Sequence, residues 1–392
     1  MFAQSRHFPL FLSIIALNAP LIWGGEPAAH PAQAEETIER IPIKKDSYSI
    51  LLPVEIQGKH YQFCLDTGAT CTAYDSSLWP LLGKIVALET IGPKEKSVPV
   101  PFFQPPDARL GKLRLPKDKW VGGVSLREFN EESGEEEHGI LGMDFLKEQI
   151  FRVDFDRAEV VFLRAVGPDP GQRLEVRLTN NRPQVNVDLP GLKEPEWFLL
   201  DTGCARGGGG DGGCLSTSAF EALTQSGKLT SIRKSMAMSV VRETKLVRAG
   251  WLDSFPFAGN IHKALCFSEH KTSLLGLDVL SRYVVTFDFP HRAIYLKKGR
   301  QFDRPIRYDC SGLQMRRVKG ETVVERVADG SAAERAGISR RNVLLQIDKE
   351  QISGMTLFAL RDRLCEEGKK ICLTVRSGRK QLDLRLVLSW DK

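Results

Sequence analysis

The sequence lacks the local motifs of several common catalytic classes. It contains no His-Glu-x-x-His segment and no Gly-x-Ser-x-Gly segment, so neither a helical zinc site nor the nucleophile turn of a serine hydrolase is indicated. None of its 8 cysteines shows the paired short spacing of a structural zinc site. Metal-dependent or serine-dependent hydrolysis is therefore poorly supported.

A concentrated basic region is also missing. The chain has 55 Lys and Arg against 49 Asp and Glu, and basic residues such as Arg152, Arg157 and Arg164 are scattered among acids. We therefore infer no nucleic-acid partner. With 392 residues, 42% hydrophobic and 27% charged, the chain has the composition of a soluble globular protein with room for two or three domains.

Long apolar stretches occur only at the N-terminus. Residues Phe8 to Trp23 are largely apolar but are interrupted by Pro20, and small residues lead up to Ala34. This pattern predicts a secretory signal peptide over residues 1–34, cleaved near Ala34, and an exported protein that is periplasmic or extracellular. The alternative is an uncleaved anchor, although the apolar core is short for a stable membrane span.

One tripeptide occurs twice in matching surroundings, as Asp66-Thr67-Gly68 and Asp201-Thr202-Gly203. Each copy follows an apolar run that predicts a buried strand, Tyr61–Leu65 and Trp197–Leu200, and each ends in a glycine that allows a sharp turn. A carboxylate at the end of a buried strand needs hydrogen-bond donors, a metal or a second carboxylate that shares its proton.

Further landmarks repeat with the same period. The two aspartates, Asp66 and Asp201, lie 135 positions apart, and an apolar-apolar-Gly segment ends at Gly142 and again 134 positions later at Gly276. A Val-Asp-Phe or Phe-Asp-Phe segment follows each copy, also with a spacing of 134. The common period indicates an internal duplication and predicts two similar lobes that face one another.

Asp-Thr-Gly on a strand, followed about 75 residues later by two apolar residues and a glycine, resembles the retropepsin and pepsin family of aspartic proteases. The resemblance covers roughly residues 45–300. It implies a mainly β protein in which two retropepsin-like β-barrel lobes, residues 35–167 and 168–300, form a bilobal aspartic protease. The turn cluster Pro168–Gly171 is the expected boundary between the lobes.

The resemblance implies that Asp66 and Asp201 form a catalytic pair that shares one proton. The ionised member would take a proton from water, and the protonated member would hydrogen-bond the scissile carbonyl, without a metal or cofactor. Which aspartate acts as the acid stays open. The residues expected to support the two loops are Thr67, Gly68, Thr202 and Gly203.

Two departures from the family pattern lie beside the aspartates. Ala69 and Cys204 stand where many acidic members have Ser or Thr, so a stabilising hydroxyl is lost and a mildly acidic to near-neutral optimum is expected. Gly207 to Gly213 has no counterpart after Asp66; it lacks the Lys and Ser/Thr of a phosphate loop and is expected to be a flexible insertion.

The remaining segments give local predictions. Residues 35–45 are expected to be a polar lead-in, Ile85 to Phe103 a hairpin that covers the substrate or a plain surface hairpin, and Val153 to Leu163 a closing hairpin. Ser216 to Ser226 is predicted to be a helix capped by Ser216 or Ser218. A solvated loop is expected for the acidic residues Glu131, Glu132, Glu135, Glu136 and Glu137.

The segment 303–392 resembles a PDZ domain of the bacterial protease-associated type, an α+β fold. Its order of strands, the turn Gly330–Ile338 and a helix from Leu357 to Glu367 carry the resemblance, although Arg341-Asn342 replaces the usual Gly-Asp. The family would bind a peptide C-terminus by strand addition. The residues that would bind it are Gly312, Leu313, Gln314 and Met315 in the loop and Leu357, Leu360 and Leu364 on the helix. The alternative is that these leucines belong to the core.

The eight cysteines allow 105 pairings, so the sequence selects none. Candidate disulfides are Cys204 with Cys214 and Cys365 with Cys372, and buried thiols are an equal alternative.

The leading prediction is an exported aspartic endopeptidase that acts on peptide or protein substrates and carries a PDZ domain. Its main rival is a catalytically weak or inactive peptide-binding scaffold, which Cys204 and the glycine-rich insertion make credible. A duplication kept only for structure is a third reading, which the buried aspartates disfavour.

Overall fold

The computed structural model describes residues 36–392 except 46, 92–97, 206–210, 238–244, 305–306 and 390–392. The predicted signal peptide therefore lies outside the described residues. In the described part of the chain, no helix is long and apolar enough to cross a membrane.

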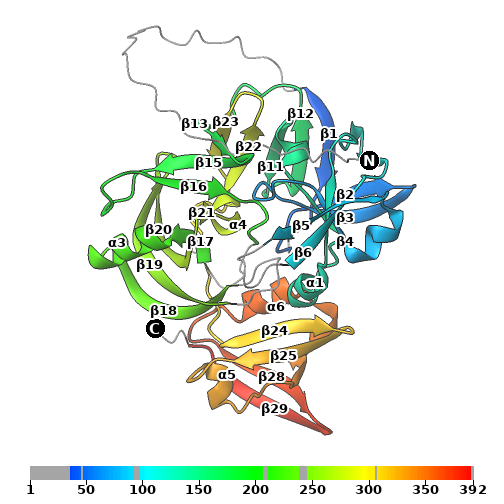
Figure 1. The fold of residues 1–392 in the computed structure, drawn as a ribbon. Coiled ribbons are helices and arrows are strands. Elements are labelled where there is room, and N and C mark those ends of the chain that lie inside the picture. Colours follow the sequence, from blue (N-terminus) through cyan, green and yellow to red (C-terminus); the bar gives the residue numbers. More distant parts are fainter. Residues whose placement is uncertain are drawn as a thin grey trace, which may run out of the picture. The chain divides into compact units, whose positions relative to one another are not determined.

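The protein is mainly β, as the sequence predicts, and its described strands form four sheets (Figure 1). These sheets do not close into a barrel within the described residues, so the prediction of β-barrel lobes is not supported in that form. Three of the sheets share one large apolar core, and the fourth has a core of its own.

The first sheet has nine strands and contains Asp66 at the end of one of them. In spatial order its strands are β5 (Ile85–Ile91), β6 (Val98–Phe103), β9 (Val121–Val124), β4 (Ala73–Asp75), β10 (Gly139–Leu141), β3 (Lys59–Leu65), β2 (Leu51–Ile56), β7 (Ala108–Leu110) and β8 (Leu113–Arg114). Strand β10 is parallel to β3 and antiparallel to β4.

The second sheet has eight strands and contains Asp201 in the equivalent place. In spatial order its strands are β14 (Arg177–Thr179), β15 (Arg182–Val187), β16 (Glu196–Leu200), β21 (Leu274–Leu275), β17 (Asp211–Ser216), β20 (Asn260–His270), β19 (Lys245–Phe257) and β18 (Leu229–Ala237). Strand β21 is parallel to β16 and antiparallel to β17. Seven strands of the first sheet, from β2 to β5 in spatial order, therefore match seven strands of the second sheet, from β15 to β18. The two sets agree in order and in relative direction.

A six-stranded sheet joins these two halves. Its order is β1 (Thr37–Pro42), β12 (Glu159–Leu163), β11 (Ile150–Asp154), β22 (Tyr283–Asp288), β23 (Ala293–Lys298) and β13 (Gln172–Glu175). The central strands β11 and β22 are antiparallel, and the rings of Phe151 and Phe287 stack with centroids 4.8 Å apart. The predicted hairpin over Val153–Leu163 is confirmed as β11 and β12. The predicted polar lead-in is wrong over Thr37–Pro42, because β1 pairs with β12.

The C-terminal module, residues 307–389, contains the fourth sheet. Its strands follow the order β24 (Leu313–Val318), β25 (Glu321–Val327), β26 (Val343–Ile347), β28 (Lys370–Ser377) and β29 (Lys380–Val387), with β27 (Glu350–Gln351) beside β26. Its helices are α5 (Ala332–Arg335), η2 (Ile352–Gly354) and α6 (Leu357–Arg363). Leu357, Leu360 and Leu364 are buried in the core of this module, as the alternative reading expected.

Short helices connect the strands of the two halves. They are η1 (Ser76–Leu81), α1 (Arg127–Ser133), α2 (Met143–Leu146), α3 (Thr217–Gln225) and α4 (Leu277–Leu280). Ser216 caps α3 by accepting a hydrogen bond from the Ala219 N–H at 3.2 Å, which confirms one of the two predicted caps.

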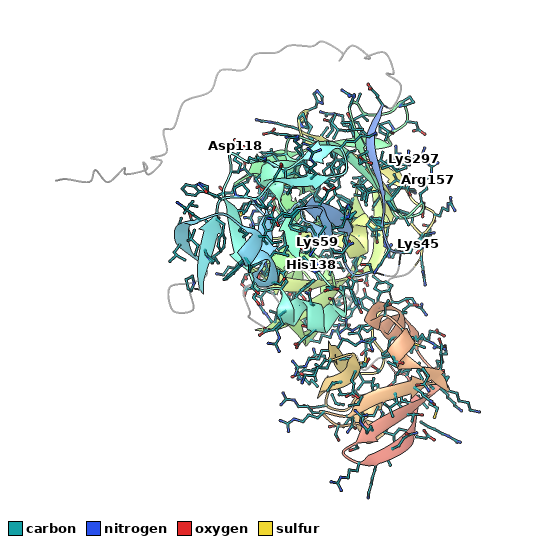
Figure 2. All side chains as sticks on the ribbon, turned by 90° about the vertical axis from the view of Figure 1, so that its right-hand side faces the viewer. Lys45, Lys59, Asp118, His138, Arg157 and Lys297 are labelled. Atoms are coloured by element: carbon teal, nitrogen blue, oxygen red, sulfur yellow. The ribbon has the colours of Figure 1, made fainter. Side chains whose placement is uncertain are left out.

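The acidic run is not the solvated loop that the sequence predicts. Its first residues belong to α1, Glu137 is only 3% exposed, and Glu135 accepts a hydrogen bond from the Tyr48 N–H at 3.3 Å. Reciprocal hydrogen bonds between the side chain of Asn130 and the backbone of Glu137 fold the run back onto the first sheet. His138, which follows this run directly, is labelled in Figure 2.

Neither candidate disulfide forms, and all eight cysteines are thiols in the described structure. The Cys365 thiol, just after α6, donates instead to the Arg361 carbonyl of that helix at 3.1 Å, whereas Cys372 lies in β28 opposite Arg385. A short separation in the sequence therefore does not bring these two sulfur atoms together.

Candidate active site

The two Asp-Thr-Gly loops begin where the buried strands β3 and β16 end. The Asp66 N–H donates to the Leu141 carbonyl at 3.0 Å, and the Asp201 N–H donates to the Leu275 carbonyl, also at 3.0 Å. In each half the apolar-apolar-Gly strand therefore fixes the backbone at the aspartate. This arrangement explains why the two sequence landmarks recur together, although about 75 residues separate them.

The two threonines bind each other's loops reciprocally and are completely enclosed. Thr67 donates from its hydroxyl to the Leu200 carbonyl at 2.6 Å, and Thr202 donates from its hydroxyl to the Leu65 carbonyl at 2.7 Å. Each hydroxyl also accepts from the other threonine's backbone N–H, at 3.0 and 3.1 Å. These four hydrogen bonds fix the two loops against each other with approximate two-fold symmetry.

Backbone N–H groups orient both carboxylates. Asp66 Oδ1 accepts from Gly68 at 2.7 Å and from Ala69 at 3.0 Å. Asp201 Oδ1 accepts from Gly203 at 2.9 Å and from Cys204 at 3.1 Å. One oxygen of each carboxylate is thus held by its own loop.

The two carboxyl groups lie directly against the opposite glycines. A Cβ atom placed on Gly68 would lie 2.5 Å from Asp201 Cγ, and one placed on Gly203 would lie 2.3 Å from Asp66 Cγ. Such distances are too short for any side chain to be accommodated without moving the carboxylate. Glycine is therefore needed at both positions because the other loop's aspartate occupies the space of the side chain.

The environment of the pair favours proton uptake. Burial, followed by the negative charge of Asp201, raises the pKa of Asp66 well above its ordinary range. Burial also raises the pKa of Asp201, opposed by hydrogen bonds from Asp66 and from the two backbone N–H groups. Two adjacent carboxyls that interact in this way hold one proton between them over a wide pH range.

A supporting pair that the sequence analysis did not assign lies behind the first loop. Asp144 Oδ1 accepts from both the N–H and the hydroxyl of Thr72 at 2.8 Å, and the Thr72 hydroxyl accepts from the Gly142 N–H at 3.3 Å. This network holds the loop that follows Asp66 against helix α2. The repeat of Gly-x-Asp at Gly142 and Gly276 is the signal that could have pointed to it.

Each half has a hairpin at the equivalent end of its sheet. Strands β5 and β6 form the predicted hairpin, and β18 with β19 form its counterpart, while residues 92–97 and 238–244 at their turns lie outside the described residues. A hollow of about 330 Å³ lies beside the first hairpin. It is lined by Cys71, Glu89, Phe102, Asp118, Lys119, Trp120 and Asp144, of which Asp118 is labelled in Figure 2.

The glycine-rich stretch is only partly described, since residues 206–210 lie outside the described residues. Contrary to the prediction of a flexible insertion throughout, its last residues belong to β17, where a Cβ on Gly213 would lie 2.1 Å from the Leu274 carbonyl oxygen. Gly213 therefore permits close packing of β17 against β21.

The loop predicted to bind peptides already uses two of its backbone N–H groups. Gly312 donates to Asp309 Oδ2 at 2.7 Å, and Leu313 donates to the Ser311 hydroxyl at 3.1 Å. Gln314 and Met315 lie on β24 and pair with β25. Leu360 and Leu364 belong to the same core as Leu313 and Met315.

No group of His, Cys, Asp and Glu side chains within the described residues could hold a metal ion. No protein-family model and no curated protein matches the chain in sequence.

Proposed function

We propose that the protein is an aspartic endopeptidase related to the retropepsin and pepsin family. The observation that carries this proposal is the reciprocal arrangement of two Asp-Thr-Gly loops, in which each carboxylate lies on the other loop's glycine and the pair has a raised affinity for a proton. The matching strand order of the two halves supports a bilobal protease of this kind.

The chemistry of the pair follows from its shared proton. The ionised carboxyl accepts a proton from a water molecule bound between Asp66 and Asp201, and that water attacks the scissile carbonyl. The protonated carboxyl donates a hydrogen bond to the developing oxyanion and later returns a proton to the leaving amine. The backbone N–H groups that donate to Oδ1 of Asp66 and of Asp201 keep both carboxyls in position during these steps.

The rest of the predicted organisation fits this proposal. Hairpins β5–β6 and β18–β19 would cover a bound peptide from both halves, and the C-terminal module has the strand and helix order of a PDZ-like domain. An N-terminal signal peptide would export the enzyme to the periplasm or the extracellular space. Its substrates would then be peptides or proteins in that compartment.

Cleavage of a quenched peptide library by residues 35–392 between about pH 3 and 8 tests the proposal, since this range brackets the ordinary carboxyl pKa values. Asp66→Asn and Asp201→Asn should each abolish cleavage, and a statine-type inhibitor should block it. Asp253→Asn, which changes an exposed carboxylate on β19, should cleave as the wild type does.

The alternative of a peptide-binding scaffold rests on Cys204, which offers Asp201 no hydroxyl group, and on the glycine-rich stretch that follows it in the sequence. It predicts that the folded wild-type protein binds peptides across the same pH range but leaves them intact. That outcome would overturn the proposed endopeptidase activity.

A further inference from the structure

Strand β24 forms one edge of the sheet in the C-terminal module. It pairs with β25, and no other described strand pairs with it. An edge of this kind is the place where a peptide could add a strand. Helix α1 of the first half contacts β24.

Two arginines of the module bind the segment around α1. Arg316 on β24 forms an ion pair with Glu131 at 3.4 Å. Arg361 on α6 donates to the Glu132 carbonyl at 3.1 Å and to the Met315 carbonyl of β24 at 2.8 Å. Arg361 therefore links the edge strand of the module to the end of α1 and uses a carbonyl of the strand in doing so.

Apolar packing completes this contact. Tyr48, from the segment before β2, is 3% exposed and belongs to the apolar core of the C-terminal module. Its ring meets Phe358 edge to face at 5.2 Å, and the Arg361 guanidinium lies 5.1 Å from its centroid. A Cβ on Gly134, just after α1, would lie 3.1 Å from Leu357 Cγ.

The adjacent loop is occupied as well. Asp309 accepts hydrogen bonds from the Ser311 hydroxyl at 2.6 Å and from the N–H groups of Ser311 and Gly312 at 3.2 and 2.7 Å. The Asp309 carboxylate thus already accepts hydrogen bonds from N–H groups that a peptide C-terminus would require. Both parts of the expected peptide site, the loop and the strand edge, have partners from this chain.

We propose that the β24–α6 face is an intramolecular docking surface whose ligand is the chain's own segment formed by Tyr48 and residues 127–137, and that this docking stabilises the strand that carries Asp66. Two residues after Tyr48, the Ile50 carbonyl accepts from the Leu65 N–H at 2.9 Å. The segment after α1 leads directly into β10, whose Leu141 carbonyl accepts from the Asp66 N–H.

The two docked segments therefore lead to Ile50 and Leu141. The carbonyls of these residues accept hydrogen bonds from the N–H groups of Leu65 and Asp66. The consequence for cleavage rests on the proposed function, whereas the docking itself does not. Release of the module would free the backbone on both sides of β3.

Hydrogen exchange of residues 35–392 tests the proposal without using activity. Arg361→Ala removes the contacts with α1, β24 and Tyr48, and we expect at least a tenfold faster exchange in peptides that cover residues 47–66 and 127–141. Arg363→Ala is the matched control, because this arginine lies on the same helix but pairs with Glu350 at 2.5 Å. It should leave the exchange of both segments unchanged.

Arg316→Gln, which removes the ion pair with Glu131 together with one to Glu325 of the module itself, provides a second variant in case Arg361→Ala does not fold. It should accelerate exchange in the same two segments. Unchanged exchange in the folded variants would overturn the docking. Faster exchange limited to residues 127–137, with residues 63–66 unaffected, would overturn the link to Asp66. Because hydrogen exchange does not require peptide cleavage, a protein without catalytic activity would still give a decisive result.

Discussion

At the scale of single residues, the site depends on glycines that have no room for a side chain. Gly68→Ala would place a methyl group 2.5 Å from Asp201 Cγ and displace that carboxyl from its partner. We expect a loss of at least about a hundredfold in kcat/KM, since a displacement of about 1 Å has an effect of this size. Gly354→Ala is the control, because a Cβ atom added there would have no heavy atom within 4 Å apart from its chain neighbours. This variant should retain full activity in the same peptide assay.

The reciprocal threonines give a second prediction at this scale. Thr67→Val removes a hydroxyl that donates to the Leu200 carbonyl and accepts from the Thr202 N–H, leaving both buried groups unsatisfied. The free energy of unfolding should fall by about 2–6 kcal/mol, at about 1–3 kcal/mol for each group. Thr67→Ser keeps the hydroxyl and should lose much less in the same urea titration.

The missing hydroxyls beside the aspartates set the expected pH dependence. Asp66 has a raised pKa, so the singly protonated pair persists to higher pH and is lost only when the pH rises through that value. Cys204→Ser adds a hydroxyl that can stabilise the ionised form, and it should move the alkaline limb of the pH profile toward lower pH. An unchanged profile, measured with the same peptide, would contradict this explanation.

At the scale of elements, the turn between α1 and β10 buries a titratable group. Burial raises the pKa of Glu137 from 4.5 to about 7, with the nearby charge of Glu135 adding to the effect and the Ser49 hydroxyl opposing it. An acid whose pKa is higher in the folded state contributes its full stability below the unfolded value, and this contribution is lost as the pH rises toward the folded value. Stability should therefore fall between about pH 4.5 and 7, by up to about 3 kcal/mol.

Urea unfolding at several pH values would measure this effect. Glu137→Gln should remove most of the fall, because the amide does not ionise. Glu136→Gln is the control, since the side chain of Glu136 is 84% exposed. If the wild type and Glu137→Gln show the same pH dependence, Glu137 is not the group responsible.

The sequence revealed most of these elements where the signal was local or repeated. The duplicated landmarks predicted strands β3 and β16 and their aspartates, and the cap of α3 was visible in Ser216. Strand β1 was missed because its partner β12 lies about 120 residues away and only pairing with it makes Thr37–Pro42 a strand. The burial of Glu137 was missed because a run of acids predicts solvation, and only its bonds with Asn130 reverse that expectation.

At the scale of the whole molecule, the six-stranded sheet should make the two halves unfold together. Phe151 stacks on Phe287 where β11 meets β22 and is fully buried. Phe151→Ala should lower the free energy of unfolding by about 3–5 kcal/mol while a single transition is retained. Leu88→Ala, at a residue that is 70% exposed, should change it little. Two separate thermal transitions in calorimetry would show that the halves are independent.

The pairing of Ala73 with Ile140 and of Cys214 with Leu274 identifies equivalent points in the two halves. Seven residues lead from Asp66 to the first point, whereas thirteen lead from Asp201 to the second. In a protein built from two identical chains, both copies of this loop would carry such an extension or neither would. Because both halves lie in one chain, each loop can have its own length, and the second is longer by six residues while the first stays short.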